Sequence, residues 1–338
     1  MTTSLDAARA MRDFRETFAA VRAEIGRVVV GHDAAIETIM TAFFAGGHVL
    51  IEGVPGTGKT LIVRSLAQAL GLSFSRIQFT VDLMPADVTG TRIVSENADG
   101  RREFTFVPGP VFAHVVLADE VNRATPKTQS SLLEAMAEQQ VTVAGTTYPL
   151  AAPFFVLATL NPIEMEGTYQ LPEAQLDRFL FKVRLDYPSQ EELERIVAAT
   201  TQADLPAVQR VLDPDEAPAR VEAHKRLVRE VLVAPHVERY VARLVHLTVP
   251  ASGGDVDAVT RYVAFGASPR AAQALVLGAK VLALLDDRPH VAIEDVDRMA
   301  REALRHRLVL NFAAEAGGVD AERIVDEVLA AARRLRAA

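Results

Sequence analysis

The sequence predicts an α/β protein in which a parallel central sheet is flanked by helices and followed by an all-helical domain. A glycine-rich loop stands between an apolar run and a stretch with helical spacing, 61–70, as expected where a strand leads into a helix. Beyond Pro188 the strand patterns fade, so we expect one domain at 1–188 and a helical one at 189–338. Three apolar runs predict strands buried on both faces of the sheet: 49–51, 115–118 and 153–160.

The N-terminal segment predicts two helices. The period breaks at 28–32, and Asp33 is placed to cap a second helix that runs to about Ala45. The apolar break contains Gly31 and is equally compatible with one wall of a nucleotide-base pocket and with a plain buried connector. In the first helix, over 1–27, apolar residues recur at spacings of three and four: Met11, Phe14, Phe18, Val21 and Ile25.

The loop after the first apolar run fits the pattern G-x-x-x-x-G-K-[ST]. Glycines let the backbone curl until several N–H groups point at one phosphate, and the following helix adds its positive end. Lys59 is expected to reach the outer phosphates, and the Thr60 hydroxyl is expected to bind Mg²⁺. The residues expected to hold the nucleotide here are Gly53, Pro55, Gly56, Thr57, Gly58, Lys59, Thr60 and Leu61.

Two hairpins are expected to project from the α/β core. After a strand at 74–79, two strand-like pieces near 91–107 flank a turn signal at 97–100. A helix that begins at Pro126 separates this hairpin from a second one near 141–150. The first hairpin is equally compatible with a contact to a substrate or partner and with an insertion that has no such role.

Polar side chains follow the next two apolar runs. Parallel sheets bind ligands at the carboxyl ends of their strands, so Asp119 is expected to hold Mg²⁺. Its neighbour Glu120 is expected to polarise the attacking water. The amide of Asn161, at the end of the following run, is able to act on that water or on the terminal phosphate.

Arg178 is expected between a short helix that begins near Leu171 and a strand at 179–185. The forked guanidinium of this residue suits the charge that builds on a phosphate in the transition state. The residue type alone is more typical of a solvated helix surface, so its role rests on a family resemblance.

The C-terminal half predicts several helices. Ser268 and Pro269 begin a strong one that runs to Leu285, with Arg270 in its first turn. Further helices are expected at 293–308 and 321–335, with their arginines on solvated faces. The eight histidines show no metal-ligand spacing, and no metal is assigned to them.

Bulk composition excludes several classes of protein. The 338-residue chain has no cysteine, which excludes disulfides, thiolate metal sites and cysteine nucleophiles. Its net charge of −8 argues against a protein that grips nucleic acid nonspecifically. No basic region precedes an apolar run at the N-terminus, and no stretch approaches a membrane span. We therefore expect no signal peptide, no membrane insertion and a cytoplasmic location.

Taken together and in this order, the motifs resemble those of the MoxR-type AAA+ ATPases over nearly the whole chain. The two hairpins resemble the helix-2 and pre-sensor-1 insertions of that clade, and the run around Arg123 also resembles this family. The remaining correspondences are 53–60 with Walker A, 115–120 with Walker B, Asn161 with sensor 1, 268–270 with sensor 2, and 171–179 with the segment whose arginine finger would be Arg178.

The resemblance implies a P-loop AAA+ core with a helical lid, ring assembly (usually a hexamer), and hydrolysis of ATP with Mg²⁺ at subunit interfaces. Arg178 would act in trans on the neighbour's nucleotide, a role that supplies on the order of 10³–10⁵ in rate. Whether Arg270 binds the nucleotide of its own subunit or of another stays open. The resemblance also implies a chaperone-like function, in which the protein remodels or activates a partner, often one with a von Willebrand factor A domain.

Two other functions are compatible with such a core. A nucleic-acid loader or helicase-like motor would need a basic channel, for which Arg101 and Arg102 in the first hairpin are the only candidates. A nucleotide-dependent switch would bind its partner with little turnover.

Overall fold

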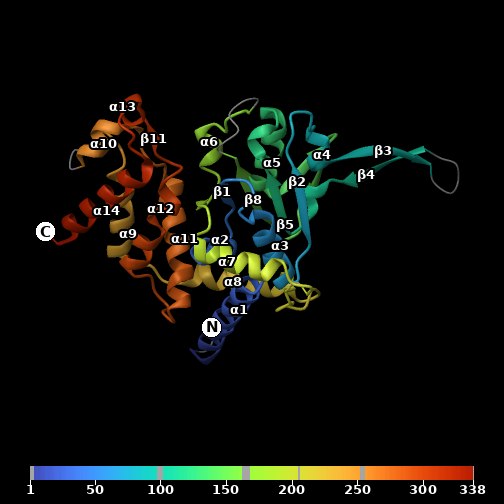
Figure 1. Cartoon of the computed structure of the whole chain (residues 1–338), viewed down its shortest axis with the longest axis horizontal. Coiled ribbons are helices and arrows are strands. Elements are labelled where there is room, and N and C mark those ends of the chain that lie inside the picture. The colour runs from blue at the N-terminus through green and yellow to red at the C-terminus, as the bar shows by residue number, and fades with distance from the viewer. Residues whose placement is uncertain (1–3, 97–101, 162–167, 205, 252–255, 338) are drawn as a thin grey trace.

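The computed structural model describes residues 4–96, 102–161, 168–204, 206–251 and 256–337. An α/β core stands beside a helical part, and a long hairpin extends from the core on the side away from that part (Figure 1). The predicted fold class is confirmed: a five-stranded parallel sheet is flanked by helices, and helices dominate the chain after it.

The central sheet has the strand order β2-β5-β8-β1-β9, and all neighbouring strands are parallel. Val49 pairs with Phe181 and Gly53 with Leu185, so β1 and β9 begin together and end together. All five carboxyl ends therefore meet at one edge. The strands are β1 Val49–Gly53, β2 Phe74–Gln78, β5 Val115–Asp119, β8 Phe155–Leu160 and β9 Phe181–Leu185.

Side chains of the strands alternate between two hydrophobic clusters, one on each face of the sheet. Val49 and Ile51 pack into one cluster, while Leu50 between them packs into the other. Because both faces are covered, the strands are apolar at nearly every position, which explains the continuous runs in the sequence. The covering helices include α3 Lys59–Ala69 on the first face and α5 Pro126–Glu138 on the second.

The two N-terminal helices are α1 Ser4–Gly26 and α2 Asp33–Ala45. The predicted apolar face of α1 is buried, with Phe14 and Val21 fully enclosed. The prediction that Asp33 caps α2 is wrong. Asp33 is the first helical residue, and the capping position is held by His32 in the left-handed conformation, with φ 59° and no capping side-chain bond.

The first hairpin is formed by β3 Gly90–Glu96 and β4 Arg102–Pro108, which pair antiparallel along their whole length. The turn signal at 97–100, and Arg101, lie outside the described residues. The stretch before β3 contains a helix that the sequence analysis does not predict, α4 Pro85–Thr89. A proline at its first position and a bond from the Met84 amide to the Asp87 carboxylate fix its start.

The second hairpin pairs β6 Gln140–Val143 with β7 Thr146–Pro149, as predicted. Its Tyr148 ring stacks on Phe106 of the first hairpin, with ring centroids 3.9 Å apart. This contact ties the base of the projecting hairpin to the rest of the core.

The C-terminal half contains one short antiparallel ribbon, β10 Val263–Phe265 with β11 Val309–Leu310, among its described helices. Ser268 caps α11 as predicted, accepting a hydrogen bond from the Arg270 amide. One hydrophobic cluster runs from Phe14 to Ala332, so this half shares its core with α1 and α2. Its helices are α7 Gln190–Thr200, α8 Ala217–Glu230, α9 Pro235–His246, α10 Asp257–Tyr262, α11 Pro269–Leu285, α12 Ile293–Leu304, α13 Phe312–Ala316 and α14 Ala321–Ala337.

Within the described part of the chain, no helix combines the length and the apolar character that crossing a bilayer requires.

Candidate active site

The glycine-rich loop links β1 to α3, as the sequence predicts. Gly56 and Gly58 have φ values of 84° and 82°, in the left-handed region that favours glycine. Gly53 is required for a different reason: a Cβ there would lie 2.9 Å from the carbonyl oxygen of Leu185 on β9. The loop therefore depends on two glycines for its curl and on one for close packing against the neighbouring strand.

Side chains within the loop stabilise this curl. The Lys59 ammonium donates to the carbonyl of Gly53 and, at 3.2 Å, to that of Val54. The Thr57 hydroxyl also donates to the Val54 carbonyl, at 3.0 Å. Burial lowers the pKa of Lys59, while the nearby charges of Asp119 and Glu120 oppose that shift. Lys59 thus lies close to the two predicted acids.

The outer surface of the loop is open. Pro55, Gly56 and Leu61 are exposed, and Thr60 is half-buried in the first turn of α3. The amides at a helix N-terminus carry partial positive charge and are free of intrahelical partners, so this opening suits an anion.

Asp119, the last residue of β5, is only 8% exposed and is held on both carboxylate oxygens. Oδ1 accepts a hydrogen bond of 2.6 Å from the Thr159 hydroxyl on β8. Oδ2 accepts two from the Arg76 guanidinium on β2, at 2.7 and 3.1 Å. Two flanking strands therefore fix this carboxylate at the edge of the sheet.

Glu120 adopts the left-handed conformation, with φ 56°, directly after β5. Its amide donates to the Thr159 hydroxyl at 2.8 Å. Its carboxylate accepts from the Gln78 amide at 2.9 Å and pairs with the Arg123 guanidinium at 3.0 Å. The two carboxylates therefore have different hydrogen-bond partners, although the Thr159 hydroxyl contacts both the Asp119 carboxylate and the Glu120 amide.

Thr159 bridges the two acids, so Thr159→Val is expected to lower the free energy of unfolding by about 1–3 kcal/mol. Valine keeps the shape but leaves the buried Asp119 oxygen and the Glu120 amide without this partner. Urea denaturation measures the loss. Thr159→Ser, which keeps the hydroxyl, is the matched control and should retain most of the stability; equal stability of Thr159→Val and wild type would contradict the bridging role.

The residues present suit Mg²⁺. Asp119 offers a carboxylate and Thr60 a hydroxyl, the hard oxygen donors that this ion prefers. Among the described residues no three His, Cys, Asp or Glu side chains form a self-sufficient metal cage. One carboxylate and one hydroxyl, completed by phosphate oxygens and water, are how nucleotide-dependent proteins usually hold Mg²⁺.

Asn161 follows β8 at the same edge and is 5% exposed. The structure thus brings together five of the predicted residues around the open loop: Lys59, Thr60, Asp119, Glu120 and Asn161.

Arg178 and Arg270 lie at the other end of the sheet. Arg178 precedes β9, whose first residue pairs with the start of β1, whereas the glycine-rich loop follows the end of β1. At about 3.3 Å per residue, strands of this length separate the two ends by roughly 15 Å. Both arginines are exposed and line one hollow of 330 Å³, together with Gly46 and Gly47.

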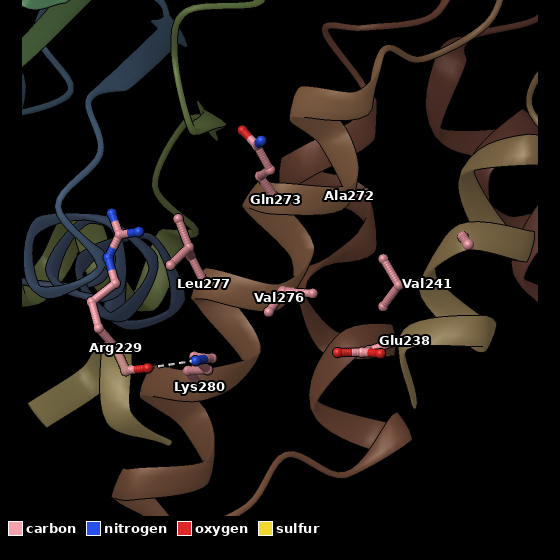
Figure 2. A pocket seen from close by; sticks show the side chains of 9 residues that line it. Arg229, Glu238, Val241, Ala272, Gln273, Val276, Leu277 and Lys280 are labelled. Atoms are coloured by element: carbon pink, nitrogen blue, oxygen red, sulfur yellow. Dashed lines mark hydrogen bonds between the residues drawn. The ribbon is translucent and has the colours of Figure 1, made fainter. Parts of the chain in front are cut away.

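A larger hollow, of 690 Å³, lies in the helical half between α9 and α11 (Figure 2). Its walls are mainly apolar, and the Lys280 ammonium at its rim donates to the Arg229 carbonyl at 2.7 Å. It shares Gln273 and Leu277 with the hollow at Arg178 and Arg270. It contains none of the predicted site residues.

The sequence prediction missed Arg76, Gln78 and Thr159. A signal for each was present: Arg76 and Gln78 alternate on one strand, and Thr159 is a polar residue inside the apolar run 154–160. Their relevance depends on which strands are neighbours, which the sequence does not state.

The chain is similar to known proteins. Residues 48–181 match a model of the ATPase family associated with various cellular activities (AAA), and residues 257–328 match a model of the AAA lid domain. The chain is 44% identical over 307 residues to Chaperone MoxR1 of Mycobacterium tuberculosis, covering 90% of this chain and 79% of that protein. It is 45% identical over 311 residues to the uncharacterized protein YeaC of Bacillus subtilis, covering 91% and 92%.

Two further comparisons agree. Protein MoxR of Methylorubrum extorquens is 32% identical over 320 residues, covering 89% of this chain and 90% of that protein. Among solved structures, a candidate ATPase from Cytophaga hutchinsonii is similar with a TM-score of 0.87 and 40% identity, covering 95% of this chain and 96% of that one.

Proposed function

Since the chain belongs to the AAA+ ATPases of the MoxR type, we propose that it assembles into a ring and hydrolyses ATP with Mg²⁺ where two copies meet. The hydrolytic cycle would serve to remodel or activate a protein client. The relative in Mycobacterium tuberculosis is named a chaperone, which supports a protein client for this chain as well.

The observation that carries the proposal is the separation of the two halves of the site. Lys59, Asp119 and Glu120 stand at the carboxyl edge of the sheet, whereas Arg178 and Arg270 are exposed at the opposite end. A side chain about 7 Å long does not cross roughly 15 Å of sheet. This separation supports a role for the arginines on a nucleotide held by another copy, and we propose that Arg270, like Arg178, acts in trans.

Each residue then has a role in the reaction. The loop amides and Lys59 bind the phosphates, while Asp119 and Thr60 would hold Mg²⁺, which neutralises charge on the outer phosphate oxygens. Glu120 orients the attacking water and accepts its proton, and Asn161 hydrogen bonds to the same water. Arg178 of the neighbouring copy stabilises the negative charge on the transferring phosphoryl group.

We take the ring to be a hexamer and the client to be a protein with a von Willebrand factor A domain, as the family resemblance implies. We place the division between nucleotide-binding core and lid at residue 188, where Ser189 caps α7. A cytoplasmic location, where MgATP is abundant, belongs to the same proposal.

Because the site needs two copies, phosphate release per subunit is expected to rise with protein concentration and to vanish where assemblies dissociate. A malachite-green assay over a dilution series, with sedimentation velocity on the same samples, measures this. Lys59→Ala supplies the background, since it removes the phosphate-binding ammonium. A specific activity that stays constant while sedimentation shows only monomers would overturn the proposal.

A further inference from the structure

The helical half, which contains the lid, forms hydrogen bonds with the segment around Arg178. The Arg307 guanidinium, from just after the end of α12, donates to the backbone carbonyls of Phe179 at 2.7 Å and Leu180 at 3.1 Å. His306 adds a third bond, from its Nε2 to the Phe179 carbonyl at 3.0 Å. The carbonyls on the C-terminal side of Arg178 are thus held by the lid.

The residue on the other side, Asp177, is held by the lid as well. Its carboxylate accepts from the Arg307 Nε at 2.7 Å and from the Ser268 hydroxyl at 2.9 Å. The Arg270 guanidinium lies 3.5 Å from the second oxygen. One carboxylate therefore contacts both the cap and the first turn of α11, and it is adjacent to Arg178.

Arg307 uses its full set of donors in this contact. Its side chain is 2% exposed, and its five N–H groups are directed at Asp177 Oδ1 and at the carbonyls of Asp177, Phe179, Leu180 and Ala303. Burial of a guanidinium is costly unless it is paired and hydrogen-bonded throughout. Replacing a buried ion pair by apolar groups often leaves stability unchanged, so this contact matters here for the defined geometry of its five hydrogen bonds.

These contacts lie next to the two exposed arginines, Arg178 and Arg270. Arg178 follows Asp177 directly in the chain, and the Arg270 guanidinium lies 3.5 Å from the Asp177 carboxylate, so this one carboxylate links α11 to both arginines. Both line the same 330 Å³ hollow. The Arg178 guanidinium also donates to the Leu133 carbonyl of the core helix α5, at a longer distance of 3.3 Å.

We propose that Asp177, clamped by Arg307 and Ser268, is a positioning residue through which the lid holds both trans-acting arginines in place. The inference rests on the proposed function and deepens it. Through this clamp, the lid of one subunit would set the positions of the arginines that act on the nucleotide of the neighbouring subunit.

Asp177→Asn tests this, because it keeps the size and removes the charge that Arg307 and Arg270 contact. The variant is expected to bind MgATP as wild type does, since its own glycine-rich loop is intact. Its turnover should fall about 10- to 100-fold, the range typical when a residue that orients a functional group is replaced. Fluorescent-nucleotide titration verifies that the protein is folded and binds.

Mixing experiments separate positioning from general damage. Asp177→Asn mixed with Lys59→Ala should regain up to about a quarter of the wild-type rate, because half of the loops and half of the fingers are intact in a random ring. Asp177→Asn mixed with Arg178→Ala should regain nothing, since both lack a placed finger. Asp13→Asn is the matched control: it breaks a carboxylate contact to Arg220 and His224 between α1 and α8, and should keep full turnover.

The outcomes are distinct. Wild-type turnover in Asp177→Asn, or no gain on mixing with Lys59→Ala while Arg178→Ala does gain in the same mixture, would overturn the positioning role alone. If Arg178→Ala also fails to gain, the shared site itself is wrong. If Asp177→Asn does not fold, Ser268→Ala takes its place: it removes one bond to the carboxylate, and its turnover should fall in the same pattern.

Discussion

Glu120→Gln is expected to bind ATP with wild-type affinity and to hydrolyse it on the order of 10²–10⁴ times more slowly. The amide has the same shape and keeps a hydrogen bond to Gln78, but it does not accept a proton from water. The Asp119 carboxylate, the proposed Mg²⁺ ligand, is held by Thr159 and Arg76 and not by the Glu120 side chain, so its position should not change. Binding and hydrolysis should therefore separate.

Isothermal titration with MgATP and a phosphate-release assay on one preparation measure the two quantities. Glu134→Gln, on the exposed face of α5, is the control and should match wild type in both. Turnover in Glu120→Gln within a few-fold of wild type would exclude Glu120 as the base. A variant that hydrolyses slowly should also retain its client in the presence of ATP, which makes it the reagent of choice for identifying that client.

Arg178→Ala is expected to lose on the order of 10³–10⁵ in turnover while its affinity for ATP stays unchanged. The loss is large because the guanidinium acts where charge builds in the transition state, and the affinity is kept because Arg178 lies at the far end of the sheet from its own loop. Arg210→Ala, an exposed arginine elsewhere, is the control.

A mixture with Lys59→Ala decides between a cis and a trans role. Each variant alone is inactive, but an Arg178→Ala loop beside a Lys59→Ala finger is complete, and about a quarter of random interfaces have this arrangement. Recovery toward that fraction supports the shared site. No recovery at saturating protein, with mixed assemblies demonstrated by sedimentation, would show that each copy works alone.

The residues around the loop could be predicted because their signals are local. Glycines at fixed offsets before Lys59, and two acids after an apolar run, each define a strand end within about ten residues of sequence. The fold class followed from the same runs, since strands buried on both faces have to be apolar throughout. Ser268 and Pro269 likewise marked the start of α11 through side-chain chemistry alone.

Residues whose roles depend on neighbours across the sheet could not be predicted. Gln78 pairs in register with Asp119 only because β2 lies beside β5, and Thr159 bridges the acids only because β8 lies on the other side. Arg307 and Asp177 are 130 positions apart, and no local pattern links them. At His32 the sequence favoured the wrong cap, since backbone conformation there, not a capping oxygen, starts the helix.

In the proposed assembly, the placement of the loop and the arginines at opposite ends of the sheet gives each subunit two different interfaces: one where its loop binds the nucleotide, and one where its arginines reach the neighbour's nucleotide. In an open oligomer, the loop of the terminal subunit would lack a neighbour's arginines and stay inactive. In a closed ring, every loop would have them. A protein that covers the arginine-bearing interface of one subunit would then inactivate the site of one neighbour and leave the other sites active. Output from such an assembly could be tuned in steps of one site.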